Sequence, residues 1–393
     1  MIYVGIDIAA EKHTCCILSE KSKVMQEFSF ENTITGFEKL LTILQGMAIP
    51  SETKIGLEST GVYGNTLCAF LRRNGFEIQI FNALLIKKSI QSTTLRKTKT
   101  DKADARFLAW YLTQALSQPD SSVSYHISEL KSLCRGRFTL LQQRSKAKTQ
   151  VKTLLVQLFP EYMSFFSSVF GAASTSVLKE YPSASAIAKS NVSDIASILN
   201  KASRRRFGEE KAAQLVELAK QSVGINSAAL EIELQFLLAQ IDLITQNIQK
   251  FEAKIKSIMK ELKSPITSIP GVGLVLGATI LAEIGDISAF ATPAKLLAFA
   301  GMDPSVCQSG SSVSSPGRMV KRGSKYLRWA LGLASRSVSR YAPVFHDYLQ
   351  KKLSEGKHYN VACSHVAKKL TRVIFAILKN NSLYSPFYSS LTA

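Results

Sequence analysis

The most regular hydrophobic pattern in the chain lies between residues 226 and 264. Apolar residues recur there at alternating intervals of four and three, and no glycine or proline interrupts the series. This spacing is typical of a coiled-coil seam, and Ser264-Pro265 predicts where the helix ends. We therefore expect a long helix that pairs two copies of the chain, with an intramolecular helical hairpin as the alternative. The seam consists of Leu230, Leu234, Leu237, Ile241, Ile244, Ile248, Phe251, Ile255, Ile258 and Leu262.

The first 120 residues alternate between strand and helix patterns. Short β-rich runs at residues 2–8, 13–18 and 24–30 predict three strands, with the last two as hairpin partners of the first. Beyond them, a predicted helix precedes each of two further strands, at 54–57 and 76–81, and a last helix covers 101–116. This order predicts a mixed α/β sheet with helices on its faces.

The remaining pattern divides the chain into four parts. We predict an α/β domain over 1–120, a basic helical segment over 121–225, the coiled coil over 226–264 and a mostly α-helical domain over 265–393. The last part opens with Ser-Ile-Pro-Gly-Val-Gly at 268–273, followed by an apolar helix. A turn of this kind resembles the helix-hairpin-helix element, which offers backbone N–H groups to DNA phosphates.

The net charge of the chain indicates what kind of partner it binds. The 393 residues carry a formal net charge of +20, which favours a polyanionic partner. The excess is about +2 in 1–120, about +8 in 121–225 and about +10 in 265–393, so the basic parts lie outside the predicted sheet.

Composition also makes several protein classes improbable. The six cysteines include no C-x-x-C pair, which argues against a zinc site and a disulfide framework. The N-terminus does not resemble a signal peptide, and prolines and glycines interrupt the uncharged run 264–282. We therefore expect a cytoplasmic, nucleoid-associated protein without a membrane span.

Four carboxylates occupy positions that suggest metal chemistry. Asp7 and Glu58 end predicted strands, and Asp101 and Asp104 share one face of a predicted helix. If these elements converge, their oxygens suit Mg²⁺ or Mn²⁺, and a pair of such ions clamps the attacking and leaving oxygens of a phosphodiester. Separately, each carboxylate has a simpler explanation as surface charge or, for Asp101, as a helix cap.

Basic residues gather around a second candidate, Ser309, which precedes a glycine in a Gly/Ser-rich loop. A serine needs activation to act as a nucleophile, and basic neighbours stabilise phosphate charge. An ordinary loop is the alternative.

The segment 121–225 contains a basic helical face, which either contacts phosphate or is simply exposed to solvent; the sequence favours neither. The candidate nucleic-acid-binding residues are Arg137, Arg144 and Lys148 on that face, and Arg318, Lys321, Arg322, Lys325 and Arg328 after the loop.

Five motifs occur in one order along the chain. They are Y-V-G-I-D at 3–7, G-L-E-S-T-G-V-Y at 56–63, K-T-D-K-A-D-A-R at 99–106, S-I-P-G-V-G at 268–273, and A-G-M-D-P…Q-S-G…G-R…K-R-G…L-R at 300–328. In this order they resemble the DEDD-type insertion-sequence transposases, the family that includes the Piv DNA invertase and the bridge-RNA-guided recombinases. The resemblance spans most of the chain.

The resemblance implies a specific fold and activity. The N-terminal domain is expected to have the RuvC-like, ribonuclease-H-type fold, with Asp7, Glu58, Asp101 and Asp104 holding Mg²⁺ or Mn²⁺. The family's catalytic serine maps onto Ser309, which attacks DNA and forms a phosphoserine link. The implied partners are donor and target DNA, a structured noncoding bridge RNA, and further copies of the chain in a dimer or tetramer.

Three other functions stay open from the residues alone. A RuvC-like nuclease or junction resolvase would use the carboxylates with water as the nucleophile. An actin-like or sugar-kinase-like ATPase also begins with a strand that ends in Gly-Ile-Asp, but we find no convincing glycine-rich phosphate loops. A scaffold that only binds nucleic acid would need none of the carboxylates.

Overall fold

The computed structural model describes residues 1–58, 63–81, 86–87, 89–90, 92, 100–114, 125–304, 308–309, 312–313 and 319–386. The chain divides into two compact units, Met1–Ser122 and Val123–Ala393. Within the described residues, no helix combines the length and apolar character needed to cross a membrane.

The first unit is built on a five-stranded sheet. Its strands are β1 (Ile2–Asp7), β2 (Lys12–Ser19), β3 (Val24–Glu31), β4 (Thr53–Glu58) and β5 (Glu77–Phe81), in the spatial order β3-β2-β1-β4-β5. The first three pair antiparallel, and β4 and β5 continue the sheet parallel to β1. The mixed sheet predicted from the sequence is confirmed.

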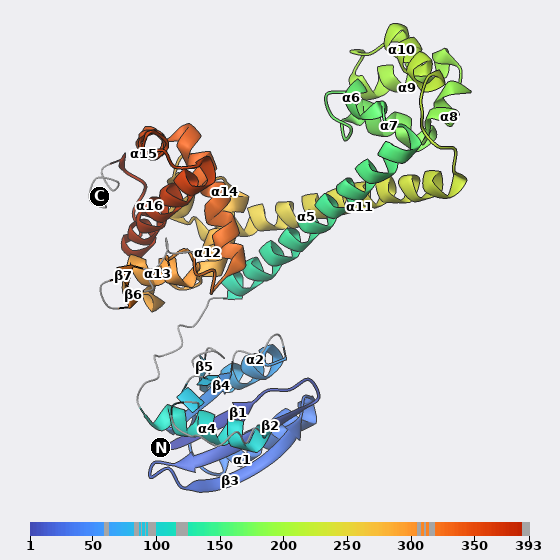
Figure 1. The fold of residues 1–393 in the computed structure, drawn as a ribbon. Helices are drawn as coiled ribbons and strands as arrows, with labels where there is room; N and C mark the ends of the chain where they lie inside the picture. The colour runs from blue at the N-terminus through green and yellow to red at the C-terminus, as the bar shows by residue number, and fades with distance from the viewer. Residues whose placement is uncertain are drawn as a thin grey trace. The chain divides into compact units, whose positions relative to one another are not determined.

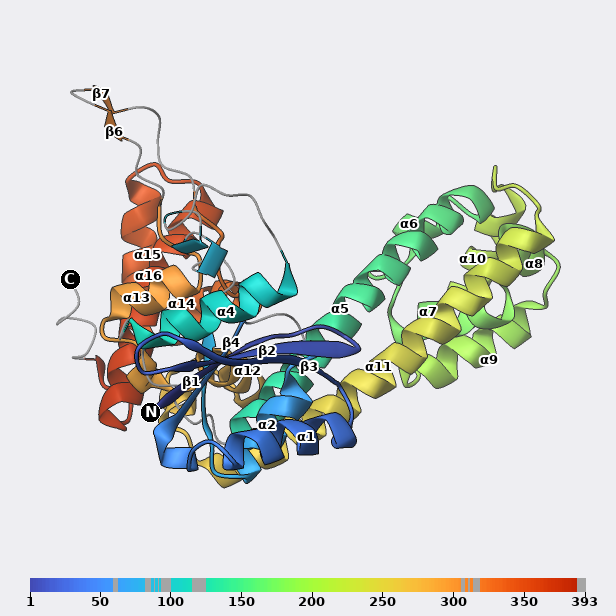
Figure 2. The same cartoon turned by 90° about the horizontal axis from the view of Figure 1, so that it is seen from below.

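Helices cover both faces of this sheet (Figure 2). On one face, α1 (Ile34–Gln45) and α2 (Asn65–Arg73) pack their leucines against buried residues of β1 and β4. On the other face, α4 (Asp101–Thr113) packs Ala105 and Ala109 against Cys16 and Leu18 of β2. The α4 face therefore has the smaller core and brings the start of a helix close to the sheet.

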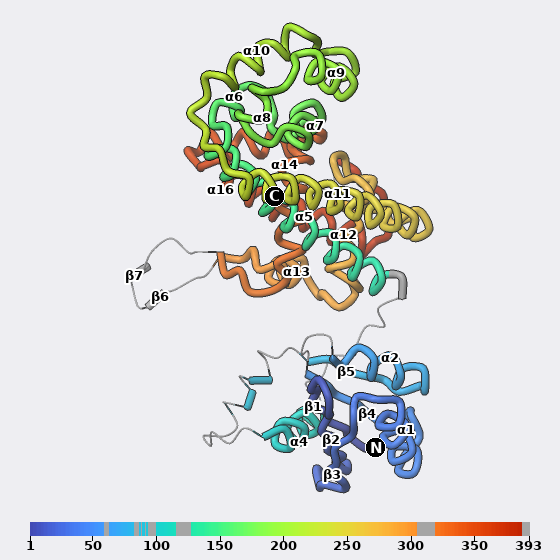
Figure 3. The backbone as a smooth tube through the Cα atoms, turned by 90° about the vertical axis from the view of Figure 1, so that its right-hand side faces the viewer, coloured from blue at the N-terminus to red at the C-terminus, as the bar shows by residue number. Residues whose placement is uncertain are grey.

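Two long helices, α5 (Tyr125–Leu158) and α11 (Ala228–Leu262), form the frame of the second unit and lie side by side (Figure 1). The end of α5 and the start of α11 share one hydrophobic core, and the start of α5 and the end of α11 share another. The two helices are therefore antiparallel, and each end of the pair carries its own helical bundle (Figure 3).

The two bundles are made of helices that are shorter than α5 and α11. The first contains α6 (Tyr162–Phe165), α7 (Ala172–Glu180), α8 (Ala184–Ala188), α9 (Val192–Ser203) and α10 (Glu209–Lys220). The second contains α12 (Leu274–Ile284), α13 (Pro293–Phe299), α14 (Lys325–Tyr341), α15 (Pro343–Ser354) and α16 (Tyr359–Asn380), with the short strands β6 (Gln308–Ser309) and β7 (Ser312–Val313). The mostly helical remainder predicted from the sequence is confirmed.

The heptad seam of α11 has a partner within the chain. Leu234, Ile244 and Ile255 are buried where α11 packs along α5. The structure thus has the intramolecular helical pair, which was the alternative to a coiled coil between two chains. A coiled coil between copies is not confirmed.

The predicted helix-hairpin-helix element is also not confirmed. A four-residue 3₁₀ turn, η2 (Pro265–Ser268), precedes the turn into α12 where that element has an α-helix. Gly271 takes φ of +90° in the turn, and its carbonyl accepts a hydrogen bond of 2.7 Å from Ser337 Oγ in α14. The turn therefore joins α12 to α14.

Candidate functional site

Asp7 and Glu58 end neighbouring parallel strands. Ile6 of β1 pairs with Leu57 of β4, so the two carboxylates follow at the same level of the sheet. Because parallel strands bring their carboxyl ends to one edge, the pairing register places both acids at that edge. This agrees with the convergence expected from the sequence.

A glycine stands two residues before each of these acids, and the two glycines allow α4 to approach the sheet closely. Side chains alternate between the faces of a strand, so Gly5 shares a face with Asp7, and Gly56 shares one with Glu58. A Cβ atom on Gly5 would lie 2.1 Å from the backbone oxygen of Ala105 in α4. Only a residue without a side chain allows this approach, and Gly56 also lies under α4. The pattern glycine-x-acid was a sequence signal that our reading missed.

The start of α4 supplies the other two carboxylates. Thr100 caps the helix, with its Oγ1 accepting a hydrogen bond of 3.2 Å from the backbone N–H of Ala103. Asp101 and Asp104 lie in the first turn, where the helix dipole favours negative charge. We call Asp7, Glu58, Asp101 and Asp104 the carboxylate cluster.

Electrostatics shows that the members of the carboxylate cluster act on one another. The pKa of Asp7 is raised to about 6, first by burial and then by the negative charges of Asp104, Asp101 and Glu58. A hydrogen bond from the backbone N–H of Ile8 lowers it by less. Carboxylates brought this close disfavour their own ionisation unless a cation joins them.

The donor set of the carboxylate cluster fits a hard divalent cation. All four side chains offer oxygen, which Mg²⁺ and Mn²⁺ prefer, and their repulsion is relieved by positive charge. In the described part of the chain, no group of three acidic, histidine or cysteine side chains is arranged closely enough to enclose an ion. The residues therefore fit the group in chemistry but do not form a closed cage.

In the second unit, Ser309 lies in a short hairpin. The backbone of β6 pairs antiparallel with β7, with Ser309 opposite Ser312, and Pro304 forms an isolated bridge with Met319 below them. The Ser309 side chain lies outside the described residues. We call residues 299–304 and 319–328, from which this hairpin rises, the hairpin base.

Arg328 holds the hairpin base together. Its Nη1 donates to the backbone oxygens of Ala300 at 3.0 Å and Lys321 at 3.2 Å. At Gly323, whose φ is +113°, a Cβ atom would lie 2.1 Å from the oxygen of Phe299, so the absence of a side chain lets the two segments of the base approach closely there. Arg328, predicted to bind nucleic acid, thus binds backbone carbonyls in this structure.

A buried carboxylate anchors the hairpin base to α5. Glu283 of α12 is 1% exposed and receives two hydrogen bonds from Arg135, of 2.6 Å from Nε and 3.0 Å from Nη2. Ser324 Oγ, which caps α14, donates a third at 2.7 Å. Although burial raises the pKa of Glu283, these bonds and nearby Lys131 hold it below its usual value. Its sequence signal was a single acid directly after the uncharged run 264–282.

Two family models match the chain over both regions. The DEDD transposase model of IS110 elements matches residues 4–160, and a model of the IS116/IS110/IS902 transposase family matches residues 263–350. Together they cover more than half of the chain. The chain belongs to the IS110/IS116 family of transposases. The first model includes the whole carboxylate cluster, and the second includes Ser309, Glu283 and the hairpin base.

Curated relatives of this family align over nearly the whole chain. The IS116 protein of Streptomyces clavuligerus is 23% identical, with 98% of this chain and 96% of the relative covered. The pilin gene-inverting protein of Moraxella bovis is 24% identical, with 96% of each covered. Among solved structures, Thermus thermophilus RuvC in complex with a Holliday junction substrate shares 9% identity at a TM-score of 0.23, covering 30% of this chain and 99% of that one.

The basic residues predicted on α5 of this transposase pack largely against the rest of the second unit. Arg137 forms an ion pair of 2.7 Å with Glu252 of α11, and the Nη1 of Arg144 lies 3.4 Å from the hydroxyl of Thr245. Lys148 lies 4.8 Å from the ring centre of Phe170, and burial and neighbouring cations lower its pKa. Lys321, Arg322 and Lys325 are exposed, and Arg318 lies outside the described residues.

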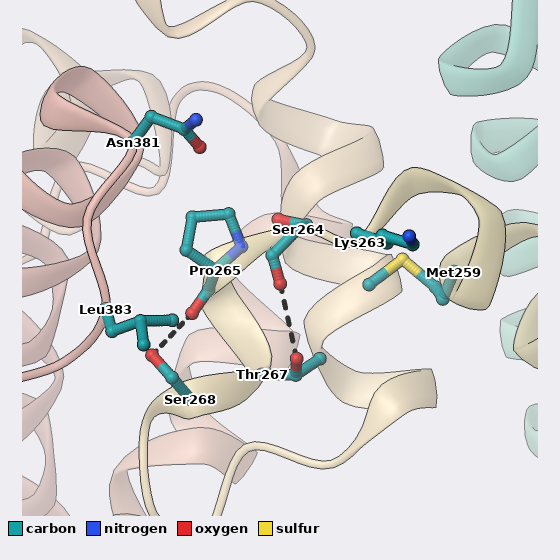
Figure 4. Close-up of a pocket in the computed structure, with 8 residues that line it drawn as sticks. All are labelled: Met259, Lys263, Ser264, Pro265, Thr267, Ser268, Asn381 and Leu383. Atoms are coloured by element: carbon teal, nitrogen blue, oxygen red, sulfur yellow. Dashed lines mark hydrogen bonds between the residues drawn. The ribbon is translucent and has the colours of Figure 1, made fainter.

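In the second unit, a cavity of about 440 Å³ lies where α11 ends (Figure 4). It is lined by Lys263, Ser264 and Asn381 among others. Hydrogen bonds within η2 stabilise its wall, including one of 2.6 Å from Ser268 Oγ to the oxygen of Pro265. The described lining residues of the cavity include none from the hairpin base.

Proposed function

We propose that this chain is the transposase of an insertion sequence, cutting and rejoining DNA with the carboxylate cluster and the Ser309 hydroxyl. The observation that carries the metal-dependent part is geometric: paired parallel strands β1 and β4 both end in an acid at one edge of the sheet, and the first turn of α4 contains two more. The raised pKa of Asp7, caused by burial and by the other three carboxylates, agrees with this. Four acids gathered at the cost of mutual repulsion are expected where a divalent ion binds. Membership of the family supports the serine-dependent part.

The proposed reaction conserves phosphodiester bonds. Ser309 Oγ attacks a phosphorus of DNA, an O–P bond forms, and the bond from phosphorus to one deoxyribose oxygen breaks. The serine proton is transferred to the released hydroxyl. A hydroxyl of another strand then attacks the phosphoserine and restores the serine, so rejoining needs no external energy source. Bound Mg²⁺ or Mn²⁺ would stabilise charge on the phosphate oxygens.

Within the chain, the two regions contribute different parts of this chemistry. Asp7 and Glu58 end paired strands, and Asp101 and Asp104 lie in the first turn of a capped helix, which supports a shared role as metal ligands. The hairpin base keeps exposed Lys321, Arg322 and Lys325 near the hairpin that contains Ser309, where they would balance phosphate charge.

The proposed partners are nucleic acids and further copies of the chain. Donor and target DNA, with a structured bridge RNA that specifies both, account for the net charge of +20. We place the reaction in the cytoplasm, on nucleoid DNA.

Self-association through α11 would need a face other than its heptad seam, which α5 covers. Ile232, Phe236 and Leu243 supply one, because all three are exposed and are spaced by four and seven residues. We propose that a second copy covers this face. Phe236→Ser is then expected to shift sedimentation toward the monomer, whereas an unchanged oligomer would exclude this face.

A covalent-adduct assay tests the proposed function. The chain is expressed with the noncoding DNA that flanks its gene, mixed with donor and target DNA and Mg²⁺, and analysed for DNA that stays bound to protein in SDS. The wild type is expected to form the adduct. Ser309→Ala and Asp101→Asn are each expected to abolish it.

Matched substitutions make the result specific. Ser312→Ala removes the hydroxyl opposite Ser309 in the same hairpin, and Glu11→Gln removes an exposed carboxylate outside the cluster. Both are expected to keep the adduct. Cleavage that continues in Ser309→Ala without any adduct would contradict the serine mechanism and favour a metal-dependent nuclease that uses water.

A further inference from the structure

A cavity of about 240 Å³ opens at the foot of the Ser309 hairpin. Two of its walls are successive turns of α14 and α16, and a third is formed by Met302 and Met319 of the hairpin base. Pro304 and Met319 form the bridge from which the hairpin rises. The cavity is therefore directly beside the segment that carries the proposed nucleophile.

The chemistry of the walls is divided between an apolar floor and a cationic mouth. Met302, Cys363 and Ala367 are buried and form the apolar part. At the exposed side, Arg336 donates a hydrogen bond of 3.1 Å from Nη2 to the side-chain oxygen of Asn360. Among the described lining residues there is no carboxylate. Such a site suits a ligand with a flat, weakly polar body and a negative charge.

Gly332 keeps this cavity open from the middle of α14. A Cβ atom there would have no heavy atom within 4 Å, although glycine costs a helix about 1 kcal/mol relative to alanine. Gly136 of α5 is different, because a Cβ there would lie 2.7 Å from the ring of Phe251. Helix packing explains Gly136, whereas at Gly332 the glycine adjoins open space.

The volume and position of the cavity indicate which ligand fits it. At about 30 Å³ per water molecule, it has room for about eight waters, which is close to the eight to eleven heavy atoms of a nucleobase. Methionine sulfur packs favourably against flat rings, and arginine binds phosphate. A nucleotide has both groups, and DNA is the polymer that the hairpin is proposed to cut.

We propose that this cavity receives one unstacked base of the DNA strand bound at the Ser309 hairpin, with the adjoining phosphate at Arg336. The inference rests on the proposed function, because it takes DNA as the molecule at the hairpin. Base extrusion bends and unstacks the strand at that step, which would present one phosphate to the hairpin.

Fluorescence of 2-aminopurine tests this inference. The base analogue is placed in turn at each position around the cleavage site in donor and target duplexes, and each duplex is mixed with the Ser309→Ala chain, Mg²⁺ and RNA from the flanking noncoding DNA. The described lining residues include no aromatic ring to quench an unstacked base. We expect a several-fold rise in fluorescence at one position.

Substitutions at Gly332 then show where the base lies. Gly332→Leu directs a branched side chain from a wall with open space at the Cβ position into the cavity, and it is expected to abolish the rise. Anisotropy of the labelled duplex, measured in parallel, identifies the protein concentration at which the variant is saturated with DNA, and the fluorescence is compared there. Gly332→Ala adds one methyl group to the same wall and is expected to retain the rise. Gly208→Leu, at an open glycine in the other helical bundle, serves as the remote control.

The outcomes separate this inference from the proposed function. A flat signal at every position, or a rise that persists in Gly332→Leu, would overturn the inference. A parallel series with the analogue in the RNA serves as a control, and a rise seen only in that series would also overturn the inference. Because Ser309→Ala cannot form the adduct, the fluorescence does not depend on the identity of the nucleophile. Failure of the adduct assay with an intact fluorescence response would therefore reject only the serine mechanism.

Discussion

The two regions that carry the proposed chemistry treat charge in opposite ways. The carboxylate cluster brings like charges together, and the pKa of Asp7 rises to about 6 from burial and from the three neighbouring acids. Around the hairpin base, two arginines instead have partners within the second unit, with Arg328 on backbone carbonyls and Arg135 of α5 on buried Glu283. Repulsion that the fold maintains is typical of a site that binds a cation, whereas an arginine whose donors are bonded within the chain has a structural role.

This difference changes how basic residues in the sequence are interpreted. Arg137 and Arg328 looked like phosphate ligands, yet both have partners within the second unit. A guanidinium has five N–H donors in a rigid fork, so it joins segments of backbone as readily as it binds phosphate. Exposed cations such as Arg322 are better candidates for nucleic-acid contact. The following predictions test the contrast, starting with the largest expected effect.

Asp7→Asn is expected to separate activity from stability. Loss of one carboxylate from the cluster should lower DNA cleavage by at least about 10²–10³-fold, the scale for removing a single preorganised electrostatic contact. The same change removes a charge that its neighbours repel, so the melting temperature of the metal-free chain should rise. Cleavage kinetics and thermal unfolding in EDTA measure the two effects.

The control for that experiment is Glu11→Gln, which changes an exposed acid near Asp7 in the sequence. It should alter neither property. If Asp7→Asn lowered the melting temperature in EDTA, repulsion within the carboxylate cluster would be excluded. If it kept full activity, the cluster would not be the metal site used for cleavage.

Glu283→Ala is expected to destabilise the second unit. The substitution leaves Arg135, whose side chain is 43% exposed, and the Ser324 hydroxyl without their shared partner. Breaking a buried ion pair in this way costs about 3 kcal/mol. Urea unfolding of the full chain measures the loss. Glu261→Ala, at an exposed acid of α11, should stay within about 0.5 kcal/mol of the wild type.

The stability of the metal-free chain should fall as the pH rises through about 6, and added metal should oppose this fall. Because the pKa of Asp7 in the folded chain, about 6, lies above its ordinary value of 3.8, the neutral carboxyl stabilises the fold at low pH. That contribution is lost as the pH rises through about 6, so the metal-free chain should melt at lower temperature at pH 7 than at pH 4.5 as far as this group is concerned. The Asp7→Asn chain isolates the contribution by difference.

Mg²⁺ should therefore raise the melting temperature more at pH 7 than at pH 4.5, since only ionised carboxylates bind it and their repulsion is then relieved. An equal rise at both values would mean that Mg²⁺ stabilises the chain at some other site.

Local patterns in the sequence were enough to predict the sheet and the carboxylate positions. Strand periodicity placed Asp7 and Glu58 at strand ends, and the three-residue spacing placed Asp101 and Asp104 on one helical face. Their convergence depends on how strands pair, which a local pattern does not contain. The glycines at positions 5 and 56 were the readable clue, because α4 approaches the sheet through them.

In the second unit, local sequence patterns do not identify which segments or side chains pair with one another. Heptad spacing describes a helix that needs an apolar partner but does not say whether that partner is another chain or α5. The same limit applies to Glu283, because an acid after an apolar run gives no sign of Arg135, which lies 148 residues away in the sequence. Long-range pairing of charges is set by tertiary packing and leaves little trace in composition.

The smallest expected effect is a change in the salt dependence of DNA binding. Arg322 is exposed, so Arg322→Ala should remove about one phosphate contact and reduce the slope of log affinity against log salt by about 0.9. Arg328 donates to the carbonyls of Ala300 and Lys321, so Arg328→Ala should leave that slope unchanged while it lowers adduct formation by loosening the hairpin base. Binding isotherms between 50 and 200 mM salt, a range of about fourfold, resolve a change of this size. Equal slope changes in both variants would mean that Arg328 contacts phosphate as well, and the two kinds of arginine would then no longer be distinct.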